Sequence, residues 1–171
     1  MSARRAGWDA AQYLRFEDER LRPAIDLIGR IGHPGPARVV DLGCGAGNAL
    51  PLLAARFPGA AIAGVDGSAA MLAKAAATGF ATHLADIAAW APEAPVDVLF
   101  SNAALQWLGG HEALFPRLLA QFAPGGVLAV QMPAMHAAPL RAEQDRIARE
   151  GPWATALAGV ASAPAILDPG A

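Results

Sequence analysis

Short, continuous apolar runs alternate along this chain with longer stretches in which apolar positions recur at helical spacing. This alternation predicts an α/β domain, an open parallel sheet with helices on both faces. The predicted strands are 38–42, 61–65 ending at Asp66, a short 82–84, 96–102 and 127–132. The predicted helices are 10–30, a segment from Asn48 to Phe57, 69–77, 112–122 and 139–150, and the Ala-Pro-Gly-Gly run at 123–126 predicts a turn. Together they predict one domain over residues 1–150, with a helical N-terminal segment at 8–31, and an irregular tail at 151–171.

The turn after the first predicted strand carries three glycines, in the string Asp41-Leu42-Gly43-Cys44-Gly45-Ala46-Gly47-Asn48. In open α/β sheets, ligands bind beyond the carboxyl ends of the strands, where a glycine turn lets backbone and ligand approach closely. The spacing here is G-x-G-x-G, whereas dinucleotide sites use G-x-G-x-x-G, and Asn48 stands where that pattern has its third glycine. A ligand without a pyrophosphate therefore fits this turn better, and a purely structural glycine turn is the alternative.

This string resembles motif I of the class I methyltransferases that use S-adenosylmethionine. The resemblance implies a Rossmann-like sheet of strand order 3-2-1-4-5 and S-adenosyl-L-methionine as cofactor, with its methionine and ribose on the glycine turn. A carboxylate at the end of the second strand can accept both ribose hydroxyls. Alternatively, Asp66 is a turn residue or a helix cap, although Ser68 is the better candidate for the cap. The implied cofactor contacts are Asp41, Gly43, Gly45, Gly47, Asn48, Asp66, Met71, Asp86, Ile87 and Asn102. Asp86 and Ile87 would lie near the adenine, and Met71 could equally be a core residue.

Further stretches, among them Leu105-Gln106-Trp107-Leu108 and Val130-Gln131-Met132-Pro133, are similar to the methyltransferases that esterify trans-aconitate. The similarity implies transfer of a methyl group to a carboxylate of a small polycarboxylate. A carboxylate is ionised at neutral pH and needs no general base, so no catalytic residue is assigned. An anionic substrate does need cationic or donor groups. The substrate-site candidates are Gln106, Trp107, Arg20 and His111, together with Arg15, Arg22 and His136.

Nothing after residue 153 resembles the antiparallel hairpin that closes the sheet in this family, beside the fifth strand. The chain is therefore expected to lack that hairpin and to self-associate through 127–132, unless its tail covers this edge. The alternatives to an active enzyme are a cofactor-binding remnant or fragment with little turnover and a nicotinamide oxidoreductase.

Composition narrows the picture further. The formal net charge of −2 over 171 residues gives no broad basic field for nucleic acid. The single cysteine, Cys44, cannot form an internal disulfide and is expected to be a small buried filler, which favours a cytoplasmic location. No apolar run reaches the length of a membrane span, and Arg4 and Arg5 are not followed by the apolar stretch of a signal peptide. Neither a membrane partner nor a metal is expected.

Overall fold

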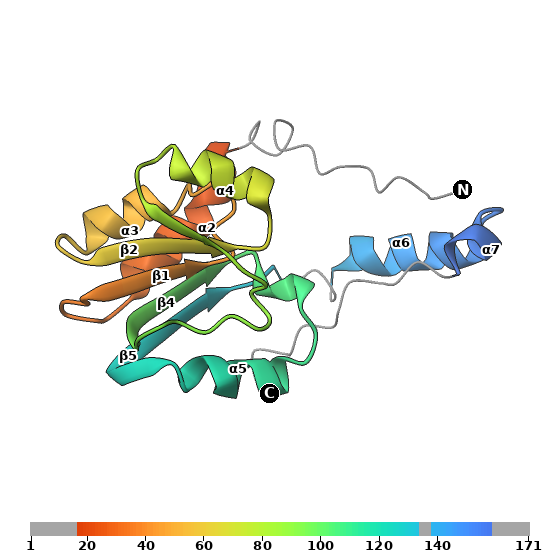
Figure 1. Ribbon diagram of the computed structural model, residues 1–171. Helices are drawn as coiled ribbons and strands as arrows, with labels where there is room; N and C mark the ends of the chain where they lie inside the picture. The colour runs from red at the N-terminus through yellow and green to blue at the C-terminus, as the bar shows by residue number, and fades with distance from the viewer. Residues whose placement is uncertain (1–16, 134–137, 159–171) are drawn as a thin grey trace.

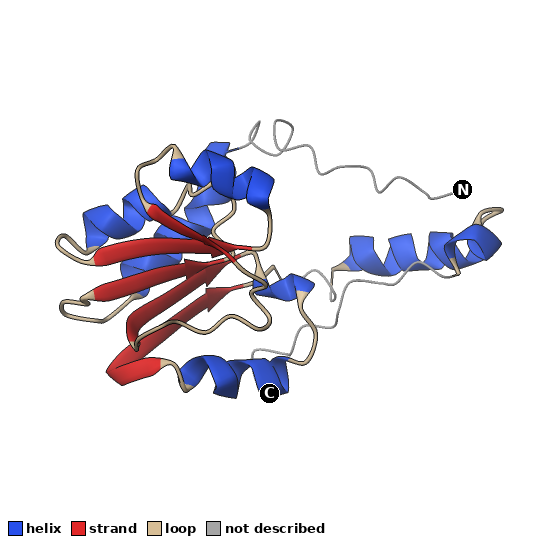
Figure 2. Ribbon diagram, in the orientation of Figure 1, coloured by secondary structure: helices blue, strands red, loops and turns tan. Residues whose placement is uncertain are grey.

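The computed structural model describes residues 17–133 and 138–158, with side chains from residue 21 onward, and contains a five-stranded sheet in the order β3-β2-β1-β4-β5 (Figures 1 and 2). Every pair of neighbouring strands is parallel. The strands are β1 Arg38–Leu42, β2 Ala61–Asp66, β3 Ala81–Leu84, β4 Val96–Asn102 and β5 Phe122–Gln131. The helices are α2 Glu17–Arg30, α3 Leu50–Arg56, α4 Ala69–Ala76, the 3-10 turn η1 Leu105–Trp107, α5 His111–Leu119, α6 Pro139–Glu150 and α7 Ala154–Leu157. The predicted fold class and strand order are confirmed.

Two apolar cores lie on opposite faces of this sheet because side chains alternate along each strand. Val39 of β1 belongs to the core formed with α2 and α3, whereas its neighbour Val40 belongs to the core formed with α5. In β4, Val98 and Leu99 divide in the same way. The carboxyl ends of β1, β2 and β4 are thereby held at one edge of the sheet, where the predicted ligand contacts follow.

Most predicted elements are confirmed, and three are corrected. The helix predicted to reach residue 122 ends at Leu119. The predicted turn at 123–126 lies inside β5, because Phe122 already pairs with Val96 and pairing resumes at Val127 after a register shift. The tail, predicted to be irregular, contains the short helix α7. Residues 10–16 of the first predicted helix and the end of the tail, 159–171, lie outside the described residues.

The Ala-Pro-Gly-Gly run is thus a bulge rather than a turn. Gly125 has a left-handed backbone with φ of 83°, and a Cβ added at Gly126 would lie 2.5 Å from the Phe122 ring and collide with it. Within the described residues β5 pairs only with β4, so the strand is an edge. Self-association through it stays a prediction.

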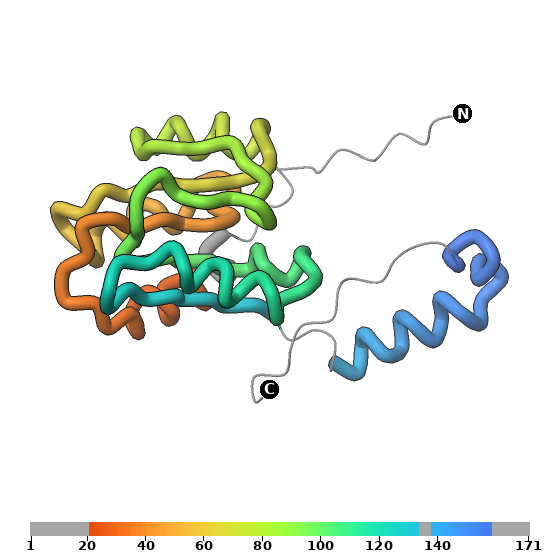
Figure 3. Tube along the Cα trace, turned by 60° about the horizontal axis from the view of Figure 1, so that its bottom comes forward, coloured from red at the N-terminus to blue at the C-terminus, as the bar shows by residue number. Residues whose placement is uncertain are grey.

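Helix α6 extends away from the sheet and carries α7 at its far end (Figures 1 and 3). None of its residues is buried, and Leu140 and Ile147 are exposed apolar side chains. Ion pairs along the helix join Arg141 to Asp145, and Arg146 to Glu143 and Glu150. Such exposed pairs contribute little to stability. In the parts of the chain that the structure describes, no helix combines the length and apolarity that a membrane span requires.

Candidate functional site

The glycine turn after β1 takes a conformation that side chains rarely adopt. Gly43, Gly45 and Gly47 have φ of 83°, 56° and 84°, all left-handed. A Cβ at Gly43 would lie 2.2 Å from the Cβ of Ala104, so the turn also packs directly against the segment that follows β4. The amides of Gly43 and Cys44 donate to the Val65 carbonyl at 2.7 and 3.0 Å, which fastens the turn to β2.

Cys44 is buried within this turn, as expected of a small filler. Burial, reinforced by the nearby carboxylates of Asp41 and Asp66, raises the pKa of its thiol. A Cβ at Gly64 of β2 would lie 2.6 Å from the Cys44 sulfur, so the thiol occupies the space that this glycine leaves. A thiol whose pKa is raised by burial is a poor nucleophile.

Asp66 connects the glycine turn to helix α4. One carboxylate oxygen accepts the Gly45 amide at 2.8 Å and the other accepts the Ser68 amide at 2.8 Å. Ser68 is the N-cap of α4, with its hydroxyl accepting the Met71 amide at 3.4 Å. Each oxygen of Asp66 retains further lone pairs. The carboxylate is therefore oriented by the backbone and remains able to accept ligand hydroxyls.

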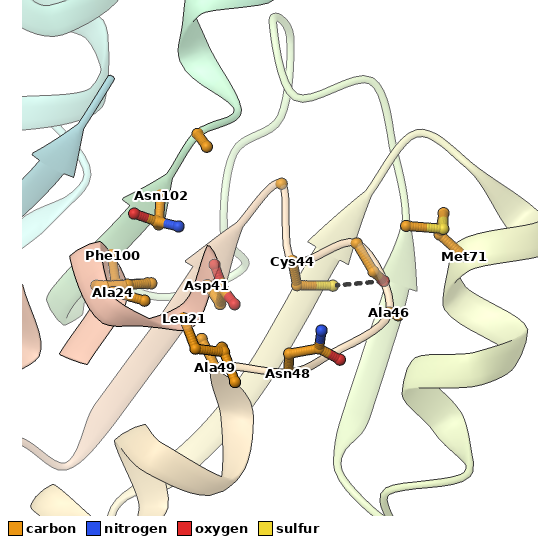
Figure 4. Close-up of a pocket in the computed structure, with 13 residues that line it drawn as sticks. Leu21, Ala24, Asp41, Cys44, Ala46, Asn48, Ala49, Met71, Phe100 and Asn102 are labelled. Atoms are coloured by element: carbon orange, nitrogen blue, oxygen red, sulfur yellow. Dashed lines mark hydrogen bonds between the residues drawn. The ribbon is translucent and has the colours of Figure 1, made fainter. Parts of the chain in front are cut away.

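A smaller cavity lies between the glycine turn, α2 and the end of β4 (Figure 4). Asp41 is only 3 % exposed, and no described residue donates a hydrogen bond to its carboxylate. Burial, and secondarily the charge of Asp66, raises the pKa of Asp41 to about 7. At the other wall, the buried side-chain oxygen of Asn102 has no hydrogen-bond partner among the described residues. Two buried acceptors thus face one cavity without donors. The remaining wall includes Leu21 and Ala24 of α2, with Asn48, Ala49 and Phe100.

A larger cavity adjoins the smaller one, and the two share Gly43, Gly45, Met71 and Ala103. Its walls come from the ends of β2 and β3, the loop after β3, and η1. Asp66, Ser68, Asp86, Ile87, Gln106 and Trp107 are among the residues that line it. Leu84 and Trp107, at 63 % and 66 % exposure, add apolar surface that water reaches. The larger cavity therefore has a mostly apolar wall with carboxylates at two positions.

The segment between β4 and η1 forms the boundary of both cavities. Ala103 has a φ of 53°, the one left-handed residue other than glycine in the described part of the chain. The Gln106 side-chain nitrogen donates to the Ala103 carbonyl at 2.6 Å, and its side-chain oxygen is buried without a described partner. The side chain of Gln106 thus bonds locally, to the backbone three residues before it, and leaves its oxygen at the cavity boundary.

The predicted substrate-site residues are not all brought together. Gln106 and Trp107 line the larger cavity. His111 is 3 % exposed, faces the Leu105 carbonyl through Nε2 at 2.9 Å and stacks on Phe115, and it lines neither cavity. The side chain of Arg20, and all of Arg15 and His136, lie outside the described part.

The predicted cofactor contacts cluster at the two cavities. Asp41, Gly43, Gly45, Asn48, Met71 and Asn102 line the smaller one, and Asp66, Asp86 and Ile87 line the larger. Gly47 lines neither and packs on Ala75, which would lie 3.0 Å from a Cβ added at this glycine. The left-handed backbone of Ala103 could not be predicted, because nothing in the sequence pattern signals it. Sequence reasoning missed the cavity-facing role of Leu21, which carries only a helical-core signal.

No lysine, arginine or histidine lines either cavity among the described residues. Three carboxylates do, those of Asp41, Asp66 and Asp86. Within the described residues no group of three potential metal ligands occurs either. The charge of this site therefore favours a cationic ligand.

Comparison with known proteins gives relatives in sequence and in structure. The chain is 54% identical to the trans-aconitate 2-methyltransferase of Methylobacterium nodulans over 92% of this chain and 62% of that protein. It is 52% identical to the protein of that name from Paracidovorax citrulli over 91% of this chain and 61% of the relative. The chain thus spans about three fifths of the length of these curated relatives. A solved S-adenosylmethionine dependent methyltransferase from Mesorhizobium loti superposes with a TM-score of 0.56 at 28% identity, covering 66% of this chain and 52% of that one.

The sequence profile of a family described as methyltransferase domain matches residues 13–158. That match includes the whole sheet, the glycine turn and every described residue that lines the two cavities. The chain therefore belongs to the methyltransferase domain family.

Proposed function

We propose that this chain binds S-adenosyl-L-methionine across the two joined cavities and transfers its methyl group to a carboxylate of a small polycarboxylate such as trans-aconitate. The observation that carries the proposal is the 54% identity to a trans-aconitate 2-methyltransferase over 92% of this chain, a span that includes both cavities. Fold alone would not support a substrate, because one fold hosts many activities.

The residues at the two cavities fit the proposed cofactor. Its ammonium and sulfonium groups are cationic, and the smaller cavity offers the buried carboxylate of Asp41 and the unpartnered oxygen of Asn102. The carboxylate of Asp66, at the junction with the larger cavity, would accept the ribose hydroxyls, and the loop at Asp86 and Ile87 would meet the adenine. When bound, the cofactor supplies an activated methyl group on a positively charged sulfur.

The work left to the chain is orientation and exclusion of water. A substrate carboxylate is already ionised at neutral pH, so no side chain has to remove a proton from it. Holding the carboxylate oxygen in line with the methyl group is the kind of positioning that lowers a barrier by roughly 7–11 kcal/mol. Ala103 lines both cavities and Gln106 lines the larger one, so in this proposal the two residues form part of the wall where the carboxylate and the methyl group meet.

Recognition of a polyanion needs cationic groups, and the described cavity walls have none. Arg20 and Arg22 on α2 are the nearest candidates in sequence to Leu21, which lines the smaller cavity. Arg22 is exposed. The proposal therefore assigns substrate binding to cations of α2, and replacing Arg20 or Arg22 by alanine should raise the KM for the polycarboxylate while leaving the Kd for the cofactor unchanged.

A two-step experiment tests the function. Calorimetric titration with S-adenosylhomocysteine and, separately, NAD comes first, with binding expected only for the former. A methyl-transfer assay then offers trans-aconitate, citrate and succinate, with ester formation expected for trans-aconitate. Binding of NAD in place of the homocysteine derivative would favour the oxidoreductase alternative. Cofactor binding without transfer to any of the acids would favour the alternative of a cofactor-binding chain with little turnover.

The proposed location of the chain is the cytoplasm. Its one cysteine is free and buried, an arrangement typical of reducing compartments.

A further inference from the structure

The loop that follows β3 brings Asp86 and Ile87 to the larger cavity, although β3 is a four-residue edge strand whose residues are mostly exposed. The loop has two bonds of its own. The Asp86 carboxylate accepts the Ala88 amide at 2.9 Å, and the Ala89 amide donates to the Asp86 carbonyl at 3.0 Å. These local bonds shape a turn, but they do not fix its position relative to the rest of the cavity.

Arg117 of α5 supplies that connection. Its Nη1 donates to the Trp90 carbonyl at 2.6 Å, and its Nη2 donates to the Ala88 carbonyl at 2.6 Å and, at a longer 3.5 Å, to the Ile87 carbonyl. Three carbonyls of one loop thus converge on one guanidinium, whose planar fork is preorganised for several acceptors. The two short bonds are charge-assisted and therefore stronger than neutral ones.

Helix α5, which carries Arg117, is packed against the core of the protein. Leu114 and Leu118, on either side of Arg117 along α5, are buried in the core beneath the sheet. Trp90 and Ile87 pack against the same core from the loop side. Within the described residues Arg117 forms no ion pair with a carboxylate. Its charge is directed entirely at the loop, which an ordinary surface arginine would not do.

We propose that Arg117 is a positioning residue that sets how well the chain selects the adenine end of its cofactor, by holding residues 87–90 against α5. This inference rests on the proposed function, which places the adenine beside Asp86 and Ile87. Arg117 itself does not line the cavity and touches no reacting group. Arg117 acts through the backbone of the loop. Replacing it should therefore reduce the difference in affinity between ligands with different purines, while the contacts to the methionine part of the ligand remain.

The test compares two ligands that differ at one purine position. S-adenosylhomocysteine carries an amino group there, and S-inosylhomocysteine carries an oxygen, which an acceptor such as Asp86 disfavours. The Kd of each is measured by calorimetry for the wild type and for Arg117→Met, which keeps most of the aliphatic stem. The variant should bind S-adenosylhomocysteine about tenfold more weakly, which is the scale of losing the charge-assisted bond between the purine amino group and the Asp86 carboxylate. S-inosylhomocysteine does not make that bond, so its Kd should change much less. The ratio of the two constants should therefore shrink.

Arg56→Met is the matched control. Arg56 also donates to a backbone carbonyl, that of Ile31 at 3.2 Å, and stacks over Phe57, but it lies on α3 and lines neither cavity. Its loss should lower the Tm while leaving the ligand ratio at the wild-type value. Arg117→Lys, which keeps the charge but not the fork, should give an intermediate ratio and guards against a Met variant that folds poorly.

The outcomes separate this inference from the proposed function. A wild type that binds neither ligand overturns the function, and the inference with it. A wild type that discriminates, alongside an Arg117→Met protein with the same ratio and only a lowered Tm, overturns the positioning role alone. A shrunken ratio in Arg117→Met but not in Arg56→Met supports it.

Discussion

The two cavities that meet at the glycine turn are built differently. The smaller has walls from β1, β4 and α2, and it encloses a carboxylate that is 3 % exposed. The larger is bounded by loops and by exposed Leu84 and Trp107, and part of its wall is held from outside by Arg117. The difference indicates that the smaller cavity presents its charge from buried strand and helix positions, whereas the larger presents its carboxylates and apolar surface mainly from loops.

The largest effect should come from a substitution at the junction. Gly45 borders both cavities and has a φ of 56°, and a Cβ there would lie 3.3 Å from the Met71 methyl. Gly45→Val should abolish binding of S-adenosylhomocysteine in a calorimetric titration, because the side chain would fill the junction. Gly79→Val is the matched control, since Gly79 has a φ of 84° and a Cβ added there would meet only open space. Equal binding by both variants would contradict a ligand that crosses the junction.

Asp66→Ala removes the carboxylate of the larger cavity that also holds the Gly45 amide, and should have the next largest effect. Binding should weaken by roughly 1.5–3 kcal/mol, the scale of hydrogen bonds that involve a charged group. Part of that loss comes from the Gly45 and Ser68 amides, which the carboxylate orients. Asp66→Asn keeps one acceptor oxygen and should lie between the two. Titration of both variants with S-adenosylhomocysteine would contradict the ribose role if neither affinity changed.

Asp41 should make the smaller cavity sensitive to pH. A pKa near 7 means that the folded, ligand-free protein holds a proton that the unfolded chain releases near pH 4. Stability should therefore fall as pH rises from about 4 to 7, and Asp41→Asn should stabilise the free protein at pH 8 by on the order of 4 kcal/mol. Denaturant unfolding at pH 5 and pH 8 measures both quantities. A wild type whose stability is the same at the two values would exclude this assignment.

The same proton opposes a cationic ligand. Binding of S-adenosylmethionine should expel the proton, so affinity should be full above pH 7 and fall about tenfold per unit below it. Asp41→Asn should bind more weakly at pH 8 and lose this slope. The larger cavity has no buried carboxylate to produce such a slope, so a variant there, Trp107→Ala, is the control.

His111 should have the smallest effect on the rate. It lines neither cavity and faces the Leu105 carbonyl, so His111→Gln should change kcat at saturating cofactor by less than about threefold, under 1 kcal/mol. Methyl transfer should then persist into mildly acidic pH. The prediction is wrong if the wild-type kcat falls steeply below an apparent pKa near 6.5 and methyl transfer is abolished in His111→Gln. That result would identify a histidine as the general base.

Local pattern and tertiary structure contributed differently to these conclusions. The strand at 38–42 and the helix at 139–150 could be predicted to the residue, because apolar runs and periodicity are properties of neighbouring positions. The bulge in β5 could not, since its glycines read as a turn until the pairing of Phe122 with Val96 is known. The hydrogen bonds of Arg117 could not be predicted for a similar reason, because its carbonyl partners lie 27 to 30 positions away in the sequence.

The sequence by itself determined the fold class, the strand order implied by its family resemblance, and the set of glycines and carboxylates at the edge of the sheet. Those follow from residue types and short-range spacing, which the chain displays before it folds. Only the tertiary structure decided that Asp41 is buried beside Asp66 with a raised pKa, that Ala103 is left-handed, and that His111 turns away from both cavities. Burial, backbone strain and side-chain direction depend on what other elements place around a residue, so no single stretch of sequence contains them.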